Sequence, residues 1–536
     1  MRWLLPALAL AGTWCVLLSH QRRIGLGLEF PSDEAYAGLA VARTLAESRT
    51  HGLAADHPAP VMRNALWRLV LASGARMSGG VVAAAYLANL LAGVVLLWLI
   101  LRVARWMFPF PPFMAFAGLL WVATPGMATR ALDGGPEILA SMLVVAAVLR
   151  HVGAQFRHRR SLSLSAALLV GLLMWIRLEF VMLWVVFILH GAVAALLGRL
   201  GRRGRSDVGV RGLNGLLLIL LVVFPLVAWN VRAIGVPWPR PPGAPLSLDA
   251  WGVSAGGALK AWAEQSKQAL AGVGEIVARN PWMAETWSAA LVLAGLGLAL
   301  ALFLVPSEPP VLGVLPLVVL LLPVLGCGMA PYLGPEGGGM VAIAVTPLCC
   351  LAAAYVVFRT TFLIESAVRR RRKGLPETSI FGVIWAVVGA AALVASGLRA
   401  VRAAGGRLED LAQQEDGRRV VREHAAGDTG LIATDRPGWL RYALGAPVMD
   451  LSGEFEPRVL AVLDAAGGLS QEKAGALLDE FHPQRLVLWE SRHAGLADGA
   501  GAEQVTQGDS WPRVYRLPVP GGPLRTPSPG PGRGPP

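Results

Sequence analysis

The sequence is short of charge. Only 15% of its 536 residues are Asp, Glu, Lys or Arg, whereas 54% are hydrophobic and the mean hydropathy is +0.54. A soluble domain carries about 25% charged residues. The composition therefore excludes an ordinary soluble protein and predicts a chain that crosses a membrane many times.

Cysteine is also scarce. The four cysteines are Cys15, Cys327, Cys349 and Cys350, and all of them lie in apolar segments. None falls in the polar C-terminal part, which excludes a disulfide framework there. The adjacent pair Cys349–Cys350 is interpreted as small packing residues inside a membrane span.

The net charge of +13 is unevenly distributed. Residues 398–536 hold 16 basic and 18 acidic side chains, a net of −2, so residues 1–397 carry +15. That excess lies in short loops between apolar runs, as the positive-inside rule requires. The basic pI is therefore explained by membrane topology, and we expect no nucleic-acid partner.

Apolar runs of about 20 residues, enough to cross a bilayer, recur through the first 397 residues. Eleven are predicted, near 3–19, 81–101, 111–126, 136–150, 162–176, 178–197, 212–231, 286–305, 309–330, 340–358 and 378–397. With the N-terminus in the cytoplasm, every strongly basic short loop lies on the cytoplasmic side. Loops 21–80 and 232–285 and the C-terminus then lie outside.

A second domain is predicted at residues 398–517. Short β-like runs, GLIAT at 430–434, APVMDL at 446–451, RLVLWE at 485–490 and RVYRL at 513–517, alternate with helical stretches. This alternation predicts a small α/β domain. The Pro/Gly-rich tail 518–536 is predicted to be disordered. The fold class is thus a polytopic α-helical membrane domain, 1–397, with an extracytoplasmic α/β domain.

An acidic pair, Asp33 and Glu34, begins an otherwise apolar helix at the outer end of the first span. Carboxylates are costly to hold near lipid, so this position indicates a functional site. The alternative is structural: after Ser32, both residues favour a helix N-terminus.

Arginines recur near the same outer surface. The stretch 61–77 is amphipathic and holds Arg63 and Arg68, which suits a surface helix whose arginines face lipid headgroups or a lipid phosphate. Arg177 and Glu179 interrupt the apolar hairpin 162–197 and are either a functional pair or a pair at a helical turn.

A few acidic and histidine side chains complete the outer group. Asp133 and Glu137 share one helical face at an outer span end, where they either line a cavity or are solvated. His51, Asp56 and His57 match no standard metal spacing. No metal site is assigned, although a divalent cation remains an open cofactor.

These residues together resemble a family. SDEAYAGLAVARTLAES at 32–48 is similar to the first-loop acidic motif of GT-C membrane glycosyltransferases, in particular the bacterial aminoarabinose and protein O-mannosyl transferases and the arabinofuranosyltransferases. DGGPEILASML at 133–143 and WIRLEFVML at 175–183 resemble two further segments in the expected order. GLIATDRPGWLRYALGAPVMDLSG at 430–453 resembles the outer domain of the arabinofuranosyltransferase-like members.

The resemblance implies an inverting transfer from a polyprenyl-phosphate sugar to a cell-envelope glycan, lipid or protein, at the outer face of a bacterial inner membrane. It implies Asp33 as the base that takes the acceptor proton. Arg177, with Arg63 and Arg68 as alternates, is expected to bind the donor phosphate. Glu34, Glu137 and Glu179 are expected to be supporting acidic residues of the cavity.

One departure keeps two alternatives open. Relatives carry an Arg-Tyr pair in a late outer loop, whereas this chain has PYLGPEGGGMVAIAVTP at 331–347, without arginine. A non-catalytic membrane scaffold is therefore one alternative. A lipid or sugar transporter is the other, although it predicts charges in mid-span and repeat symmetry.

Overall fold

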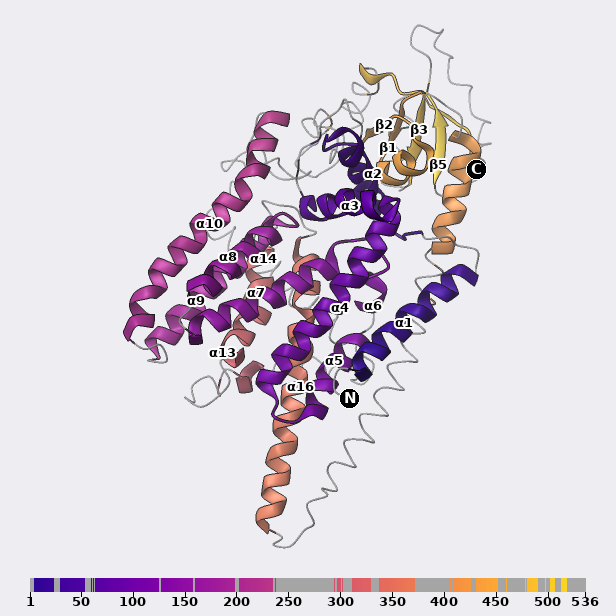
Figure 1. Cartoon of the computed structure of the whole chain (residues 1–536). Helices are drawn as coiled ribbons and strands as arrows, with labels where there is room; N and C mark the ends of the chain where they lie inside the picture. The colour runs from indigo at the N-terminus through magenta and orange to yellow at the C-terminus, as the bar shows by residue number, and fades with distance from the viewer. Residues whose placement is uncertain are drawn as a thin grey trace, which may run out of the picture.

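The computed structural model describes residues 4–23, 29–53, 63–124, 127–157, 160–197, 202–234, 311–328, 337–371, 411–425, 430–451, 480–489, 502–506 and 512–517, with single positions between these ranges. Figure 1 shows a bundle of helices with a small sheet at one end, beside α2 (Asp33–Ser48) and α3 (Ala65–Ser78). Short helical turns join many of the elements.

Five described helices contain a run long and apolar enough to cross a membrane. They are α4 (Val81–Met107), α7 (Glu137–Arg157), α9 (Val181–Leu196, preceded by the 3-10 turn η1, Leu178–Phe180), α10 (Arg202–Ile234) and α16 (Gly337–Arg371). The polytopic helical architecture is thereby confirmed.

Four shorter apolar helical stretches coincide with further predicted spans. They are α1 (Leu4–Arg23), α5 (Pro111–Ala123), α8 (Arg160–Met174) and the run formed by α13 (Val311–Pro316), η2 (Leu317–Leu321) and α14 (Leu322–Gly328). The predicted span 378–397 and most of 286–305 lie outside the described residues. The number eleven, the orientation and the domain boundaries stay predictions.

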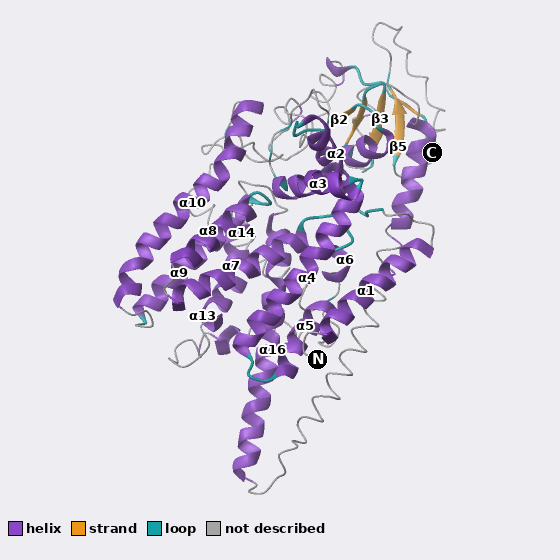
Figure 2. Ribbon diagram, in the orientation of Figure 1, coloured by secondary structure: helices purple, strands orange, loops and turns teal. Residues whose placement is uncertain are grey.

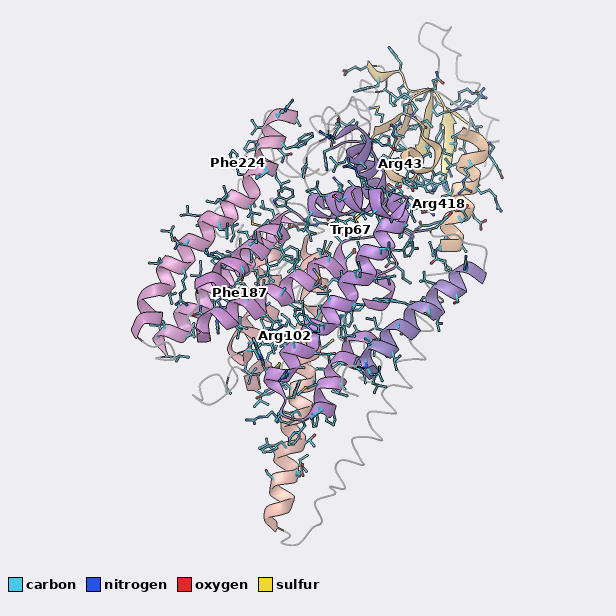
Figure 3. The ribbon with its side chains drawn as sticks, in the orientation of Figure 1. Arg43, Trp67, Arg102, Phe187, Phe224 and Arg418 are labelled. Atoms are coloured by element: carbon cyan, nitrogen blue, oxygen red, sulfur yellow. The ribbon has the colours of Figure 1, made fainter. Side chains whose placement is uncertain are left out.

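Burial separates the spans into inner and outer helices. The apolar run of α16 is 94% buried inside the protein, whereas that of α10 is 22% buried. Phe224, on the outer side of α10 in Figure 3, is 64% exposed. An exposed apolar helix surface suits contact with lipid tails, so α10 lies at the periphery of the bundle.

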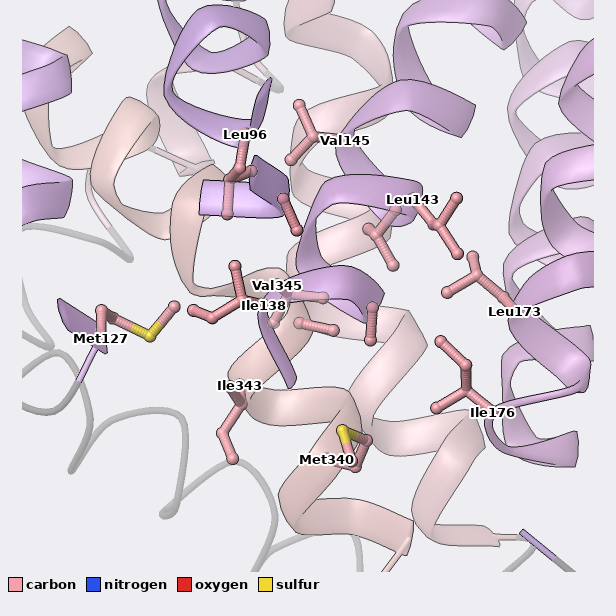
Figure 4. Close-up of a cluster of buried hydrophobic side chains, with 14 of the residues drawn as sticks. Leu96, Met127, Ile138, Leu143, Val145, Leu173, Ile176, Met340, Ile343 and Val345 are labelled. Carbon is pink, nitrogen blue, oxygen red and sulfur yellow. The ribbon is translucent and has the colours of Figure 1, made fainter. Parts of the chain in front are cut away.

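The core of the bundle is formed by close packing between α4, α7, α8 and α16. Figure 4 shows Leu96, Leu143, Leu173 and Val345, one from each of these helices, meeting in one apolar cluster. Each of these four side chains is at most 6% exposed. Packing of this density holds the ends of the helices in fixed relative positions.

The C-terminal sheet has five strands in the order β2-β1-β3-β5-β4, shown in orange in Figure 2. They are β1 (Ile432–Thr434), β2 (Val448–Asp450), β3 (Arg485–Leu488), β4 (Glu503–Gln504) and β5 (Arg513–Arg516). β1 pairs in parallel with β2 and β3, whereas β5 pairs antiparallel with β3 and β4. The four predicted β runs are confirmed, and β4 is an addition that the sequence did not indicate.

Arg418 joins this domain to the bundle. It lies in the helical segment 411–425 and is only 2% exposed. Its guanidinium donates to the Glu29 carboxylate at 3.1 Å and to the Phe30 carbonyl at 3.0 Å, and it lies 4.7 Å from the ring centroid of Tyr36. A buried guanidinium needs such partners, so Arg418 helps to hold the sheet domain against the segment that precedes α2.

We expect Arg418→Met to weaken this docking, because it leaves Glu29 without its cation. Removing one partner of a buried ion pair costs about 3 kcal/mol. Hydrogen exchange of the 411–425 amides, measured by mass spectrometry in detergent, should become faster. The control is Arg419→Met, since Arg419 is exposed and pairs only with Asp416 among the ion pairs of the described chain. Equal exchange in both variants would contradict the role of Arg418.

Candidate active site

A cavity of about 160 Å³ lies at the end of the bundle nearest the sheet. Its wall comes from the start of α2, from α3 and from the turn between α6 (Met127–Arg130) and α7. The charged and polar residues of this wall are Ser32, Glu34, Asn64, Arg68, Arg130, Asp133 and Glu137. Both signs of charge therefore line one cavity.

The sequence at 32–38 explains how Glu34 reaches the cavity. Ser32 caps α2 by accepting the Ala35 amide at 3.2 Å, so the helix begins at the cavity wall. Glu34 then accepts from the Asn64 side-chain amide at 2.9 Å and lies 3.9 Å from Arg63. Asn64 is 4% exposed, and its side-chain oxygen has no partner among the described residues.

Arg68 is the most deeply buried cation of the wall, at 2% exposed. Its guanidinium lies 3.1 Å from His51 Nε2, and His51 in turn lies 3.3 Å from the Ala59 carbonyl oxygen. α3 is a helix, as the amphipathic pattern predicts. Arg68 lines the cavity. Whether its ligand is a lipid headgroup or a lipid phosphate stays a prediction.

The turn before α7 needs glycine. Gly134 has φ +79°, and a Cβ there would lie 2.7 Å from the Phe30 ring. The Gly134 carbonyl accepts from the Trp67 indole at 2.9 Å, and the Gly135 carbonyl accepts from Asn89 at 2.9 Å. This fixed turn places Glu137 3.6 Å from Arg130, on the cavity wall.

Arg177 and Glu179 form a second charged group, beside the first. Arg177 Nη1 lies 3.7 Å from Glu179 Oε1. Arg177 is 6% exposed and Glu179 is 1% exposed, so the pair is buried in the protein. The pair lies at the turn between α8 and α9, where the structural alternative placed it, and its functional role stays a prediction. The charge of Arg63 also stabilises the Glu179 anion, and the Asn64 amide donates to the Ile176 carbonyl at 2.8 Å. The start of α3 therefore connects this pair to the cavity.

Asp33 faces the other way, toward the sheet domain. Its Oδ1 accepts from the Trp439 amide at 2.8 Å and its Oδ2 from the Gly438 amide at 3.0 Å. Both amides belong to α18 (Pro437–Trp439), which follows β1 and leads into η3 (Leu440–Leu444). Asp33 is half-buried and is absent from the cavity wall, although both of its neighbours line it.

Burial disfavours the ionised form of several of these groups. Desolvation raises the pKa of Asp33 above its ordinary value, and the two amides, with Arg436 and Arg418, oppose that rise. Burial and the nearby Glu415 raise the pKa of Glu29. Burial also raises the pKa of Tyr36 to about 12, so its hydroxyl stays protonated.

The predicted site residues thus fall into three places. Glu34, Arg68 and Glu137 line the cavity, and Arg63 is paired with Glu34; Arg177 and Glu179 form the adjacent pair; Asp33 contacts the C-terminal domain. The sequence missed Asn64 and Arg130, which carry no motif. In the described part of the chain, no three His, Cys, Asp or Glu side chains are grouped closely enough to hold a metal ion, while Asp56 and His57 lie outside it.

No family model and no curated protein matches this sequence. Among solved structures, the fold matches ArnT from Cupriavidus metallidurans bound to undecaprenyl phosphate, with a TM-score of 0.56, 14% identity, and 96% of this chain and 97% of that chain covered. The apo form of the same ArnT matches with a TM-score of 0.52, at 14% identity and with the same coverage of both chains.

The archaeal oligosaccharyltransferase AglB from Archaeoglobus fulgidus, in complex with an inhibitory peptide and a dolichol-phosphate, matches with a TM-score of 0.51. Identity is 11%, over 92% of this chain and 71% of that chain. The chain therefore shares the fold of ArnT and AglB, which agrees with the fold that the resemblance of the acidic motif implies.

Gly134→Ala should destabilise the cavity wall by about 2–4 kcal/mol, since it adds left-handed strain and an overlap with Phe30. The matched control is Gly12→Ala on the exposed surface of α1, where an added Cβ meets nothing within 4 Å. That change should be neutral or stabilise by up to about 1 kcal/mol. Thermal unfolding in detergent measures both, and an unchanged midpoint for Gly134→Ala would contradict the described turn.

Proposed function

We propose that this protein is an inverting glycosyltransferase that moves a sugar from a polyprenyl-phosphate donor to a cell-envelope glycan, lipid or protein. The observation that supports this most is the charged cavity in an ArnT-like fold, at the end of the bundle nearest the sheet. The buried cation Arg68 lines it together with the carboxylates Glu34 and Glu137. ArnT has been solved with undecaprenyl phosphate bound, which supports a polyprenyl-phosphate ligand for the same fold here.

The chemistry needs one cation and one base. A hydroxyl of the acceptor attacks the anomeric carbon of the donor sugar as the bond from that carbon to the phosphate oxygen breaks, which inverts the configuration. The phosphate leaves with its negative charge, and a guanidinium binds it through two parallel hydrogen bonds. Arg68 is suited to this role by its burial in the cavity wall, with Arg63 and Arg177 as the neighbouring cations.

The proton of the acceptor hydroxyl passes to a carboxylate. Asp33 remains the proposed base, because it belongs to the motif that suggested the family and lies between two residues of the cavity wall. Glu34, Glu137 and Glu179 are proposed to orient the arginines and the donor. Asn64 suits a sugar hydroxyl, since its buried oxygen has no partner in the described chain and can accept a hydrogen bond.

Sugar transfer in membranes tests the assignment. With total polyprenyl-phosphate sugars as donors and matched protein levels, Asp33→Asn should lower transfer at least about 100-fold, because a general base contributes roughly 10²–10⁴-fold. Equal product from both forms would mean that Asp33 is only structural and that another carboxylate is the base. Wild type without product from any donor would contradict the proposed function and favour the scaffold or the transporter.

A second variant tests the cavity itself. An added Cβ at Gly38, on the cavity wall, meets nothing within 4 Å, so Gly38→Leu should fill part of the space without unfolding the helix. We expect the KM for the donor to rise about tenfold or more, with thermal stability kept. Gly12→Leu, a similarly open site in α1, is the control. Equal KM values in the two variants would show that the donor binds elsewhere.

A further inference from the structure

The sheet domain contacts the acidic motif through the backbone that follows β1. This segment brings the Gly438 and Trp439 amides to 3.0 and 2.8 Å from the two carboxylate oxygens of Asp33. We call this pair of hydrogen bonds the Asp33 contact. With one donor on each oxygen, the rotation of the carboxylate is fixed. Each oxygen has two lone pairs, so the contact leaves capacity to accept a further proton.

Only glycine fits at position 438. A Cβ built there would collide with the Asp33 carbonyl oxygen and with the Ala37 backbone nitrogen. The backbones of α18 and α2 therefore touch directly, without a side chain between them. A contact of this kind cannot be reproduced by a displaced loop, so it depends on the docked position of the whole C-terminal domain.

Three further interactions hold the same two surfaces together. Arg441 donates to the Leu53 carbonyl at 2.7 Å, and Arg43 donates to the Tyr442 carbonyl at 3.3 Å while its guanidinium lies 4.2 Å from the Tyr442 ring centroid. Figure 3 places Arg43 and Arg418 at this junction. The Asp33 contact is thus one part of a continuous interface, which also includes the ion pair between Arg418 and Glu29.

The position of the contact in the sheet is informative. β1 has a parallel neighbour on each side, and the loop after β1 leaves from the carboxyl ends of these strands. In open α/β sheets, ligands bind at the carboxyl ends of strands where the chain order diverges to both sides. Here the loop from that edge binds a carboxylate of the same chain, on the membrane domain.

We propose that Gly438 and Trp439 are positioning residues of the transfer reaction, whose amides orient the Asp33 carboxylate so that the C-terminal domain completes the active site. This inference rests on the proposed function. It assigns the C-terminal domain a role in catalysis, because without docking the base is no longer held. The cavity residues Glu34 and Arg68 do not take part in this contact.

The first test does not need activity. Asp33→Ala removes the acceptor of both amides, whereas Glu34→Ala removes the neighbouring carboxylate and leaves the contact intact. We expect hydrogen exchange across residues 436–442 to be about tenfold faster in Asp33→Ala than in Glu34→Ala. The reason is that Asp33→Ala removes the two hydrogen bonds that the Gly438 and Trp439 amides donate to the carboxylate. Equal exchange in the two variants would overturn the Asp33 contact.

The second test isolates one amide. Trp439 has φ −66°, which proline adopts, so Trp439→Pro removes the amide at a compatible backbone angle. Trp439→Ala removes the same ring but keeps the amide. We expect kcat of the proline variant to be about tenfold below that of the alanine variant, with the KM values for donor and acceptor within twofold of each other. A loss confined to KM, or equal kcat values, would overturn a positioning role.

Gly438→Ala is the independent second variant, because its Cβ separates the two backbones while both amides remain. It should lower kcat in the same way and speed exchange across 436–442. Full activity in Gly438→Ala would contradict the inference. If the wild-type protein transfers no sugar, the proposed function fails together with the catalytic half of the inference, and the exchange experiment still decides whether the contact exists.

Discussion

The hydrogen bonds between the Asp33 carboxylate and the Gly438 and Trp439 amides connect the two halves of this protein. A carboxylate at the end of a membrane bundle is costly to bury unless it accepts hydrogen bonds. Two backbone amides from the sheet domain supply them. In return, the domain gains a fixed position over the start of α2, which Arg418 reinforces from the neighbouring helix.

The same physical constraint organises the cavity. Three charged side chains of its wall each have a partner of opposite sign or a polar neighbour: Glu34 has Asn64 and Arg63, Glu137 has Arg130, and Arg68 has His51. These pairs leave the space between them open. An anionic ligand that enters would exchange one partner for another, which costs less than burying a bare charge.

The sequence predicted much of the fold because its signals are local. Nine of the eleven spans predicted from apolar runs coincide with described helices. Four of the five strands of the described sheet coincide with the predicted β-like runs. β4 was missed because two residues, Glu503 and Gln504, carry no periodic pattern. The acidic pair and the arginines were also visible, since charges are rare in this chain.

The sequence could not predict which charges meet. Asp33 and Glu34 are neighbours, yet one faces the sheet domain and the other faces the cavity, because adjacent helical residues point about 100° apart. The partners of Asp33 lie 405 and 406 residues away and are backbone amides, which no motif identifies. Asn64 and Arg130 likewise join the site only through packing of α3 and the turn before α7.

The central claim is that the cavity binds the phosphate of a lipid-linked sugar. The most direct measurement is photo-crosslinking of the purified protein with a polyprenyl phosphate that carries a photoreactive group beside the phosphate, followed by peptide mapping. We expect label in residues 63–68, 130–137 or 175–179, displaced by unlabelled polyprenyl phosphate. Label confined to the lipid-facing surface of α10, and not displaced by the competitor, would contradict it.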